Sequence, residues 1–271
     1  MVTGVQTCAL PIWIAPQVVI FAVCSVVTAV VYLFNWRLAL KIGTNEFRAA
    51  TGDDGAVLVP PLYVTVCVLF LSLLAGFGML SEWPVVMQFL HRVPFGDSEP
   101  IFGRDIGFYV FSLPFLKMLQ SWFSSMTLFS LAGSVILYLL CRSLRSEEGN
   151  IVLVRRARLH VTSLCAVFSV WIGAGLWLSR YELLYSPSGI VFGMGYTDYN
   201  VRLTAVTIFS IAALAAALLL IVTTLVRGVW KASVILIGLL VGAGFFAQTL
   251  LPSLVQNYVV KPNEYELEHR G

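Results

Sequence analysis

Long stretches without a charged side chain constrain the fold of this sequence more than any other feature. Five of them separate short clusters of charge, and a sixth precedes Arg37. The five cover residues 55–81, 118–141, 159–179, 203–226 and 232–260. A helix rises about 1.5 Å per residue and the hydrocarbon core of a bilayer is about 30 Å thick, so about 20 apolar residues span it. The sequence therefore predicts an all-α fold, a polytopic transmembrane helix bundle.

Composition excludes an ordinary soluble domain. Hydrophobic residues make up 59% of the chain and charged residues 11%, whereas soluble domains carry about 25% charged residues. The net charge of +3 is small and the basic residues are scattered, so nucleic acid is not predicted as a partner. The five cysteines show neither a CxxC motif nor a paired Cys/His spacing. No metal site, disulfide framework or cofactor is therefore predicted.

The first residues of the chain need separate treatment. The segment at 2–12, VTGVQTCALPI, matches the translation of a common sequencing-adapter strand. We interpret residues 1–12 as a sequencing artefact and expect the natural sequence to begin near Trp13. The alternative, a signal peptide, is disfavoured because no basic residue precedes the apolar run. The chain is therefore expected to be a fragment of a longer protein.

The apolar stretches predict six membrane spans. They are placed at residues 13–36, 62–80, 115–141, 159–178, 203–226 and 229–251. The loop after the third span is rich in arginine, which predicts that it is cytoplasmic by the positive-inside rule. Its arginines are Arg142, Arg145, Arg155, Arg156 and Arg158. Successive loops alternate between the two sides of the membrane, so both the tail at 252–271 and the start of the first span are predicted to lie outside. A protein whose N-terminus is cytoplasmic would then need a seventh span before Trp13.

Two glycines mark a predicted helix contact. Gly238 and Gly242 form a GxxxG motif in the sixth span, and small residues let helix backbones approach closely in lipid. The first interpretation is packing within one bundle, and the sharper alternative is a homodimer face.

The first predicted external loop, at 82–114, is long and rich in aromatic residues. Water does not favour so much apolar surface, so the loop should pack on the bundle or lie at the level of the lipid headgroups. Its polar candidates are Arg104 and Asp105. We interpret them first as groups that fix the loop and alternatively as ligand-binding groups.

The second predicted external loop, at 179–203, holds the candidates Arg180, Glu182 and Asp198. The tyrosines around them are typical of the aromatic belt at a membrane surface. Asp198 or Asn200 is suited to cap the helix that follows. A site for a sugar or lipid headgroup, built from Tyr, Asp and Arg side chains, is the alternative.

Four blocks of the sequence carry a family resemblance. They are PFGDSEPIFGRDIGFYVFSLPF at 94–115, ARLHVTSL at 157–164, RYELLYSPSGIVFGMGYTDYNVRL at 180–203 and LPSLVQNYVVKPNEYELE at 251–268. In this order they resemble successive blocks of the UPF0182 family of uncharacterised prokaryotic membrane proteins. The resemblance implies about seven spans in a plasma membrane, followed by a large extracytoplasmic domain that would begin near the end of this chain. It carries over no catalytic residue.

The motifs of common enzymes are missing from the sequence, which has no HExxH, GxSxG or GxxxxGK[ST], so an enzyme is not predicted. Ion pathways through a membrane are commonly marked by several ionisable residues within the spans. The charge-free stretches hold one residue that could readily carry a charge, His160, so ion-coupled transport is disfavoured. We expect a bundle that anchors an extracytoplasmic domain in the cell envelope, in a scaffold or interaction role. Its expected partners are the lipid bilayer and, beyond it, envelope proteins or further copies of the chain. The alternative is a transporter or lipid-handling protein.

Overall fold

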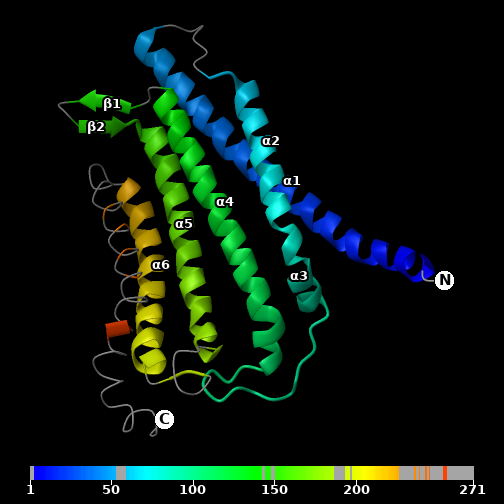
Figure 1. The fold of residues 1–271 in the computed structure, drawn as a ribbon. Coiled ribbons are helices and arrows are strands. Elements are labelled where there is room, and N and C mark those ends of the chain that lie inside the picture. The colour runs from blue at the N-terminus through cyan, green and yellow to red at the C-terminus, as the bar shows by residue number, and fades with distance from the viewer. Residues whose placement is uncertain are drawn as a thin grey trace. The chain divides into compact units, whose positions relative to one another are not determined.

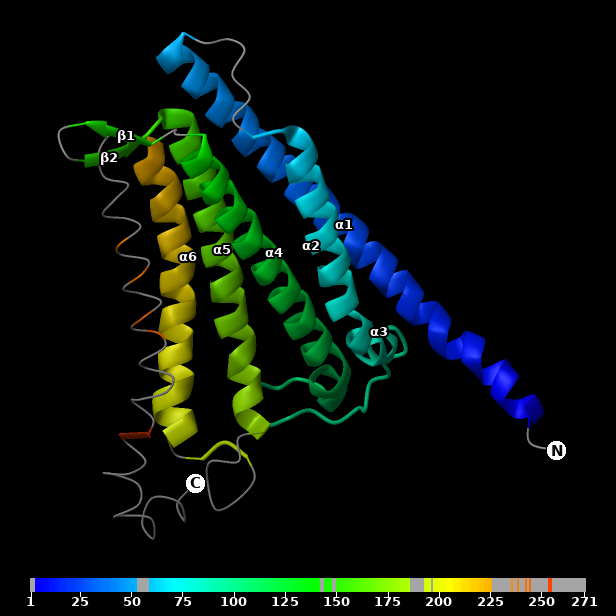
Figure 2. The ribbon, with the colours of Figure 1, turned by 45° about the horizontal axis from the view of Figure 1, so that its top comes forward.

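Six α-helices and one short hairpin make up the described part of the chain. The computed structural model describes residues 3–52, 59–141, 144–147, 150–185, 193–195 and 197–225, with six single positions between 235 and 254. The helices are α1 (Thr3–Thr51), α2 (Pro61–Gly78), α3 (Trp83–Leu90), α4 (Leu113–Leu140), α5 (Arg155–Glu182) and α6 (Leu203–Leu225) (Figures 1 and 2). The hairpin pairs β1 (Leu144–Glu147) with β2 (Asn150–Leu153) in antiparallel register.

Five helical stretches of the described chain are long and apolar enough to cross a membrane. They are Ile14–Ala49, Pro61–Leu90, Phe108–Leu140, Arg155–Tyr185 and Asp198–Thr223. These stretches correspond to the first five predicted spans, so the helical, membrane-type fold is confirmed to that extent. The sixth predicted span, at 229–251, and the tail at 252–271 fall almost wholly outside the described residues. The count of six spans of seven therefore stays a prediction.

The helices are longer than the charge-free stretches predicted. α1 continues past Arg37 and Lys41 to Thr51, because Lys and Arg are good helix formers whose charged ends reach water without ending the helix. α5 likewise begins at Arg155. Among the described residues, the hairpin at 144–153 departs from the predicted all-α fold. It lies in the arginine-rich loop, where charge gave no indication of a strand.

Two of the membrane-type helices begin with a π-helical turn. Phe108–Ser112 leads into α4, and Asp198–Arg202 leads into α6. In both cases the helix continues without a break, at Leu113 and at Leu203. A π turn closes its hydrogen bonds over five residues, one more than an α turn.

The chain divides into two compact units. The first comprises Met1–Met118 and Ser125–Leu164, and the second comprises Leu119–Ser124 and Cys165–Gly271. In the first unit α1 packs along α2, and Gly76 of α2 lies so close to α1 that a β-carbon there would collide with the Ser25 side chain. The helices of this unit approach each other at small residues, as helices in lipid do.

Serine hydroxyls link α5 and α6 in the second unit. Ser169 donates to the Ala213 carbonyl at 2.8 Å, and Ser210 donates to the Gly173 carbonyl at 3.0 Å. Both serines are buried. Within a bilayer, buried hydroxyls commonly bond to a neighbouring helix. Such an interhelical hydrogen bond contributes about 0.6 kcal/mol to stability on average. The Ala-rich sequence of α6 allows the approach that these bonds need.

Candidate functional site

The loop between α3 and α4 is organised around the carboxylate of Asp105. One oxygen accepts hydrogen bonds from the backbone N–H of Phe95 at 3.2 Å and of Gly107 at 2.6 Å. The other accepts from the N–H of Gly96 at 2.9 Å. Gly96 has a φ of +83°, which favours glycine because a side chain would be strained there. Asp105 thus ties together two parts of the loop that are about ten residues apart in sequence.

A second carboxylate, that of Glu99, closes the middle of the same loop. Its oxygens accept from the N–H of Ile101 at 2.6 Å and of Phe102 at 2.8 Å. The buried hydroxyl of Tyr109 donates to it as well, at 3.2 Å. Sequence reasoning did not single out Glu99, although an acidic residue two and three positions before N–H donors is a known turn pattern.

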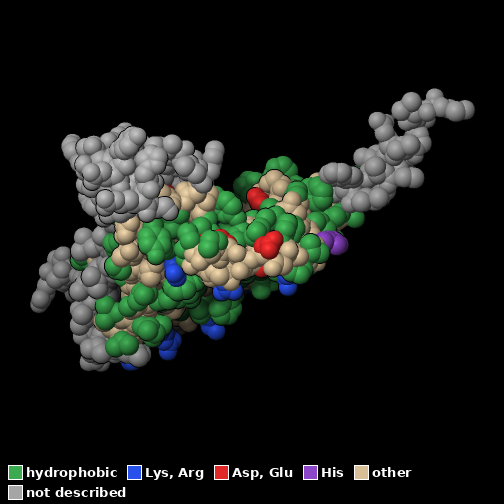
Figure 3. All heavy atoms as spheres, turned by 90° about the horizontal axis from the view of Figure 1, so that it is seen from below, with side chains coloured by type: hydrophobic (Ala, Val, Ile, Leu, Met, Phe, Trp, Pro, Cys, Tyr) green, Lys and Arg blue, Asp and Glu red, His purple; other side chains and the backbone are tan. Residues whose placement is uncertain are grey.

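Arg104, next to Asp105 in sequence, contacts an aromatic ring of the same loop region. Its guanidinium sits over the Phe108 ring, 5.4 Å from the ring centre, and the residue is exposed. Phe95 of the loop stacks on Phe111 in the π turn before α4, and Phe89 of α3 stacks on Phe115 of α4. Figure 3 views the molecule from the end where this loop lies and shows charged side chains scattered among hydrophobic ones. The loop is a closed, self-bonded structure with an arginine at its surface.

The titration of Asp105 provides a test of this arrangement. Its pKa is lowered, chiefly by the Phe95 N–H and further by those of Gly96 and Gly107, while partial desolvation opposes them. A lowered pKa means that the carboxylate stabilises the loop above its ordinary pKa of about 4 and that this is lost as pH falls through the lower value. We expect the amide NMR shifts of Gly96 and Gly107 to titrate below about pH 4.

Asp105→Asn should abolish that titration and speed proteolysis within the loop at neutral pH. Asp97→Asn is the matched control, because Asp97 is an exposed loop carboxyl whose backbone carbonyl, not its side chain, makes the loop contact with Ile106. Equal proteolysis rates for the two variants would contradict the structural role of Asp105.

The candidates of the second loop lie in the second unit. Asp198 is 1% exposed and pairs with Arg202 at 2.9 Å, one turn along the helix. It is the first residue of the π turn, so it lies inside the helical turn and not at the predicted N-cap position. Arg180 stands over the Trp177 ring at 4.2 Å, and Glu182 ends α5. Asp198 and Arg180 therefore have structural contacts of their own, and a ligand site built from these three residues stays a prediction.

The predicted packing glycines fall where the structure describes isolated positions. A β-carbon at Gly238 or at Gly242 would meet no described atom within 4 Å, whereas one at Gly244 would contact the Phe209 ring. The packing and homodimer interpretations of the GxxxG motif both stay predictions.

The structure brings together a polar cluster that sequence reasoning did not assemble. Tyr138 of α4 and Asn35 of α1 both contact the imidazole of His160, which lies in the second turn of α5. The Tyr138 oxygen is 2.9 Å from Nδ1, and the Asn35 amide oxygen is 3.2 Å from Nε2. All three residues are buried. His160 was noted in the sequence as an isolated residue near a span end, and neither partner was considered.

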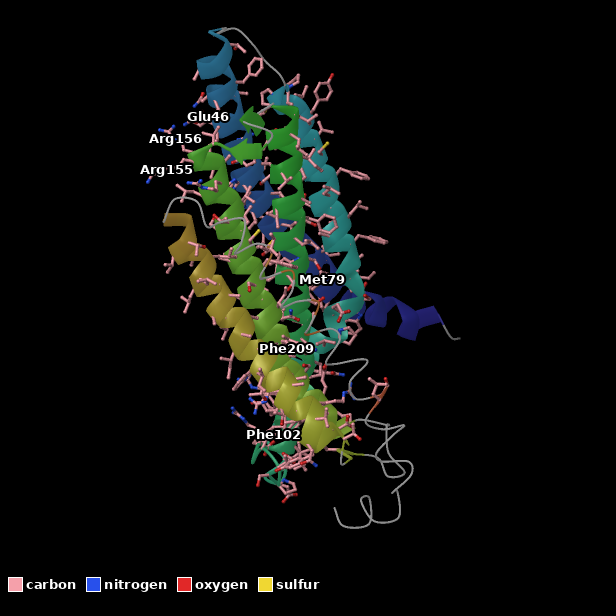
Figure 4. The ribbon with its side chains drawn as sticks, turned by 90° about the vertical axis from the view of Figure 1, so that its left-hand side faces the viewer. Glu46, Met79, Phe102, Arg155, Arg156 and Phe209 are labelled. Atoms are coloured by element: carbon pink, nitrogen blue, oxygen red, sulfur yellow. The ribbon has the colours of Figure 1, made fainter. Side chains whose placement is uncertain are left out.

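The ends of the first unit differ in chemistry. Arg155 and Arg156 project at one end, where α5 begins, and Phe102 of the aromatic loop lies at the other (Figure 4). This is the arrangement that alternation of the loops predicts for a membrane protein.

Comparison with known proteins places this arrangement in a family. A family model described as an uncharacterised protein family, UPF0182, matches residues 5–270. The chain belongs to the UPF0182 family. The resemblance carried by the sequence blocks at 94–115 and 180–203 is thereby confirmed.

Curated relatives of this UPF0182 chain come from several bacteria. A UPF0182 protein of Trichlorobacter lovleyi is 33% identical over 211 residues, 78% of this chain and 24% of that protein. One of Trichodesmium erythraeum is 32% identical over 253 residues, 88% of this chain and 27% of that protein. One of Kocuria rhizophila is 34% identical over 200 residues, 74% of this chain and 20% of that protein. No solved structure matches the chain.

The UPF0182 chain therefore spans about a quarter of the length of the curated relatives it matches. The names of those relatives state the family and no activity. What the whole protein does has to be argued from the residues.

Proposed function

We propose that this chain is the membrane anchor of a longer protein of the prokaryotic cell envelope, in which it positions an extracytoplasmic domain that acts as a scaffold or interaction module. The observation that carries the proposal is the closed loop between α3 and α4. Two of its three carboxylates accept backbone N–H groups, Asp105 from three and Glu99 from two. Oxygen atoms occupied in this way hold a loop in shape and leave little capacity for a ligand.

The length of the relatives supports the same proposal. The aligned region is 24% of the Trichlorobacter lovleyi protein and 27% of the Trichodesmium erythraeum protein. Most of each relative therefore lies outside the region described by this chain, and an activity there would need only a stable platform. A platform of apolar helices in a plasma membrane, in contact with lipid and with envelope proteins or further copies, fits that need.

The orientation is part of the proposal. The arginine-rich end of the first unit, marked by Arg155 and Arg156, is assigned to the cytoplasm, and the aromatic loop and the tail at 252–271 to the outside. Reporter fusions to the tail measure this directly. A tail reporter that is active in the cytoplasm alone would overturn the assignment.

Exchange of the anchor in a full-length relative tests the function. In a deletion strain of the host, the relative with its bundle replaced by an unrelated bundle of the same topology should complement the phenotype as well as the native protein does. Arg104→Ala should also complement. Loss of complementation by the exchanged protein, with its external domain folded and displayed at the normal level, would refute the anchoring role.

A transporter or lipid-handling protein is the second candidate, and the buried cluster around His160 is the observation that favours it. Polar residues inside a membrane bundle are costly to place and commonly mark a substrate or ion pathway. This function predicts that Arg104→Ala or Asp198→Ala abolishes complementation while expression and membrane insertion stay normal. The same strains therefore separate the two functions.

A further inference from the structure

The buried face of α1 in the first unit carries polar side chains among aromatic and aliphatic ones. Ser25, Thr28 and Asn35 are all buried, and their spacing of three and seven residues puts them on one side of the helix. The opposite side is apolar and exposed, at Val26, Val30 and Phe34 among others. A soluble helix has the reverse pattern. Contact with lipid explains the apolar exposed face of α1, but it does not explain the polar side chains on its buried face.

The buried face of α4 repeats the pattern. Thr127, Ser130, Ser134 and Tyr138 recur every three or four residues, and all of them are buried. Exposed neighbours such as Ile136 are apolar. The two polar faces meet, because the indole N–H of Trp36 on α1 donates to the Ser130 carbonyl at 3.3 Å.

Three hydroxyls of these faces are buried without a hydrogen-bond partner in the described structure, namely those of Ser25, Thr28 and Ser130. They differ from Ser134, whose hydroxyl donates to the Ser130 carbonyl at 2.7 Å. Buried polar groups in proteins nearly always have a partner, and where the protein supplies none the partner is ordered water. The Ser25 hydroxyl lies against Gly76 of α2, whereas those of Thr28 and Ser130 belong to the buried faces of α1 and α4 and point to water within the unit.

The cluster at His160 has a defined direction of hydrogen bonding. The Asn35 amide nitrogen donates to the Val31 carbonyl at 2.8 Å, so its oxygen faces Nε2 of His160 and must accept. Nε2 therefore carries the proton of a neutral imidazole, and Nδ1 accepts from the Tyr138 hydroxyl. On protonation Nδ1 would become a donor, and the Tyr138 hydroxyl would have to turn and accept.

Among the described side chains around it, His160 is the principal group that can accept a proton near neutral pH. α4 presents the Tyr138 hydroxyl and, one turn further on the same face, the buried thiol of Cys141. α1 presents the amide of Asn35, and on α5 itself the exposed Arg156 precedes His160 by one turn. A histidine is the side chain that changes charge near neutral pH.

We propose that the polar faces of α1 and α4 hold a file of water molecules and that His160 exchanges its proton with the aqueous phase along this file. The ligands of the site are water and the proton. The buried face of α1 supplies Thr28, that of α4 supplies Ser130, and Asn35 and Tyr138 hold the imidazole at the end of the file. The proposal goes beyond the anchoring function and does not depend on it.

Solid-state NMR of the labelled full chain in lipid bilayers tests the water file. Magnetisation transferred from water should reach Thr28, Ser130 and His160 within the time in which it reaches the exposed His91, and it should be slow to reach Val30 and Ile136. The His160 nitrogen signals, identified by their loss in His160→Gln, should change between about pH 5 and about pH 8. Water transfer to Thr28 and Ser130 no faster than to Val30, or His160 signals that do not respond to pH, would overturn the proposal.

A variant pair tests the route. Thr28→Val keeps the shape of the side chain and removes the hydroxyl, so water transfer to His160 should fall by about twofold or more. Thr28→Ser keeps the hydroxyl and should restore it. Thr65→Val is the matched control, because the Thr65 hydroxyl bonds its own helix at Pro61. If Thr28→Val matches Thr65→Val in this transfer, the file does not pass Thr28 and the proposed route is wrong. If Thr28→Val does not fold, the wild-type measurement above still decides.

Discussion

Gly133→Val is expected to destabilise the first unit by about 3 kcal/mol, near the upper end of the usual range for overpacking. Gly133 of α4 lies against the indole ring of Trp36 on α1, and a β-carbon at this position would overlap the ring. The ring cannot simply turn away, because its N–H is bonded to the Ser130 carbonyl and it stacks on Tyr32 at 5.5 Å. The helices would have to separate. Unfolding in a detergent titration, followed by circular dichroism, measures the loss.

The neighbouring position provides the control for this substitution. Ala132 is exposed on the opposite side of α4, so Ala132→Val adds a similar volume without meeting another helix and should change stability by less than about 0.5 kcal/mol. In the Gly133→Val background, Trp36→Ala should recover part of the loss by removing the ring. Equal stabilities for Gly133→Val and Ala132→Val would show that α1 and α4 do not pack here.

His160→Leu should be the other strongly destabilising change, by about 2 kcal/mol. The substitution keeps an apolar side chain in the space, but it leaves the Tyr138 hydroxyl and the Asn35 amide oxygen buried without partners. Each buried group left without a partner costs about 1–3 kcal/mol, while double-mutant cycles in membrane proteins give about 0.6 kcal/mol for a typical bond. Burial of both partners places the expected value above that average.

A double-mutant cycle distinguishes lost hydrogen bonds from lost packing. Tyr138→Phe removes the hydroxyl that His160→Leu would leave unpaired, so the two changes together should cost less than their sum. Ser163→Ala is the control on the same helix, because its exposed hydroxyl bonds only the His160 carbonyl of its own helix. Strictly additive effects at Tyr138 and His160 would mean that the contact at 2.9 Å contributes nothing to stability.

The helical part of the fold could be predicted because hydrocarbon excludes charge so strongly. Each described charge-free stretch corresponds to a membrane-type helix. The ends could not be predicted in the same way, because Arg37 and Lys41 continue α1 instead of ending it. The hairpin at 144–153 was missed for a related reason. Its residues lie in a charged loop, and charge says little about local structure outside the membrane.

The loop between α3 and α4 and the polar cluster at His160 were predicted with unequal success. Arg104 and Asp105 were interpreted as groups that fix the loop, and the structure shows how each is held: Asp105 bonds backbone groups and Arg104 stands over an aromatic ring. The spacing of Ser130, Ser134 and Tyr138 was visible along α4. That His160 would join Tyr138 to Asn35, 125 residues away in sequence, depends on how three helices pack, and no local pattern contains that information.

The π turns at the starts of α4 and α6 have a consequence for how this protein tolerates change. A π turn stores one residue beyond the α-helical count, so an insertion or deletion in the loop ahead of it can be absorbed within Phe108–Ser112 or Asp198–Arg202. The helix that follows keeps its rotation. The length of the loop ahead of each helix and the orientation of that helix's buried hydroxyls are thereby separate variables, so either loop is free to change in length while the helix after it stays in register.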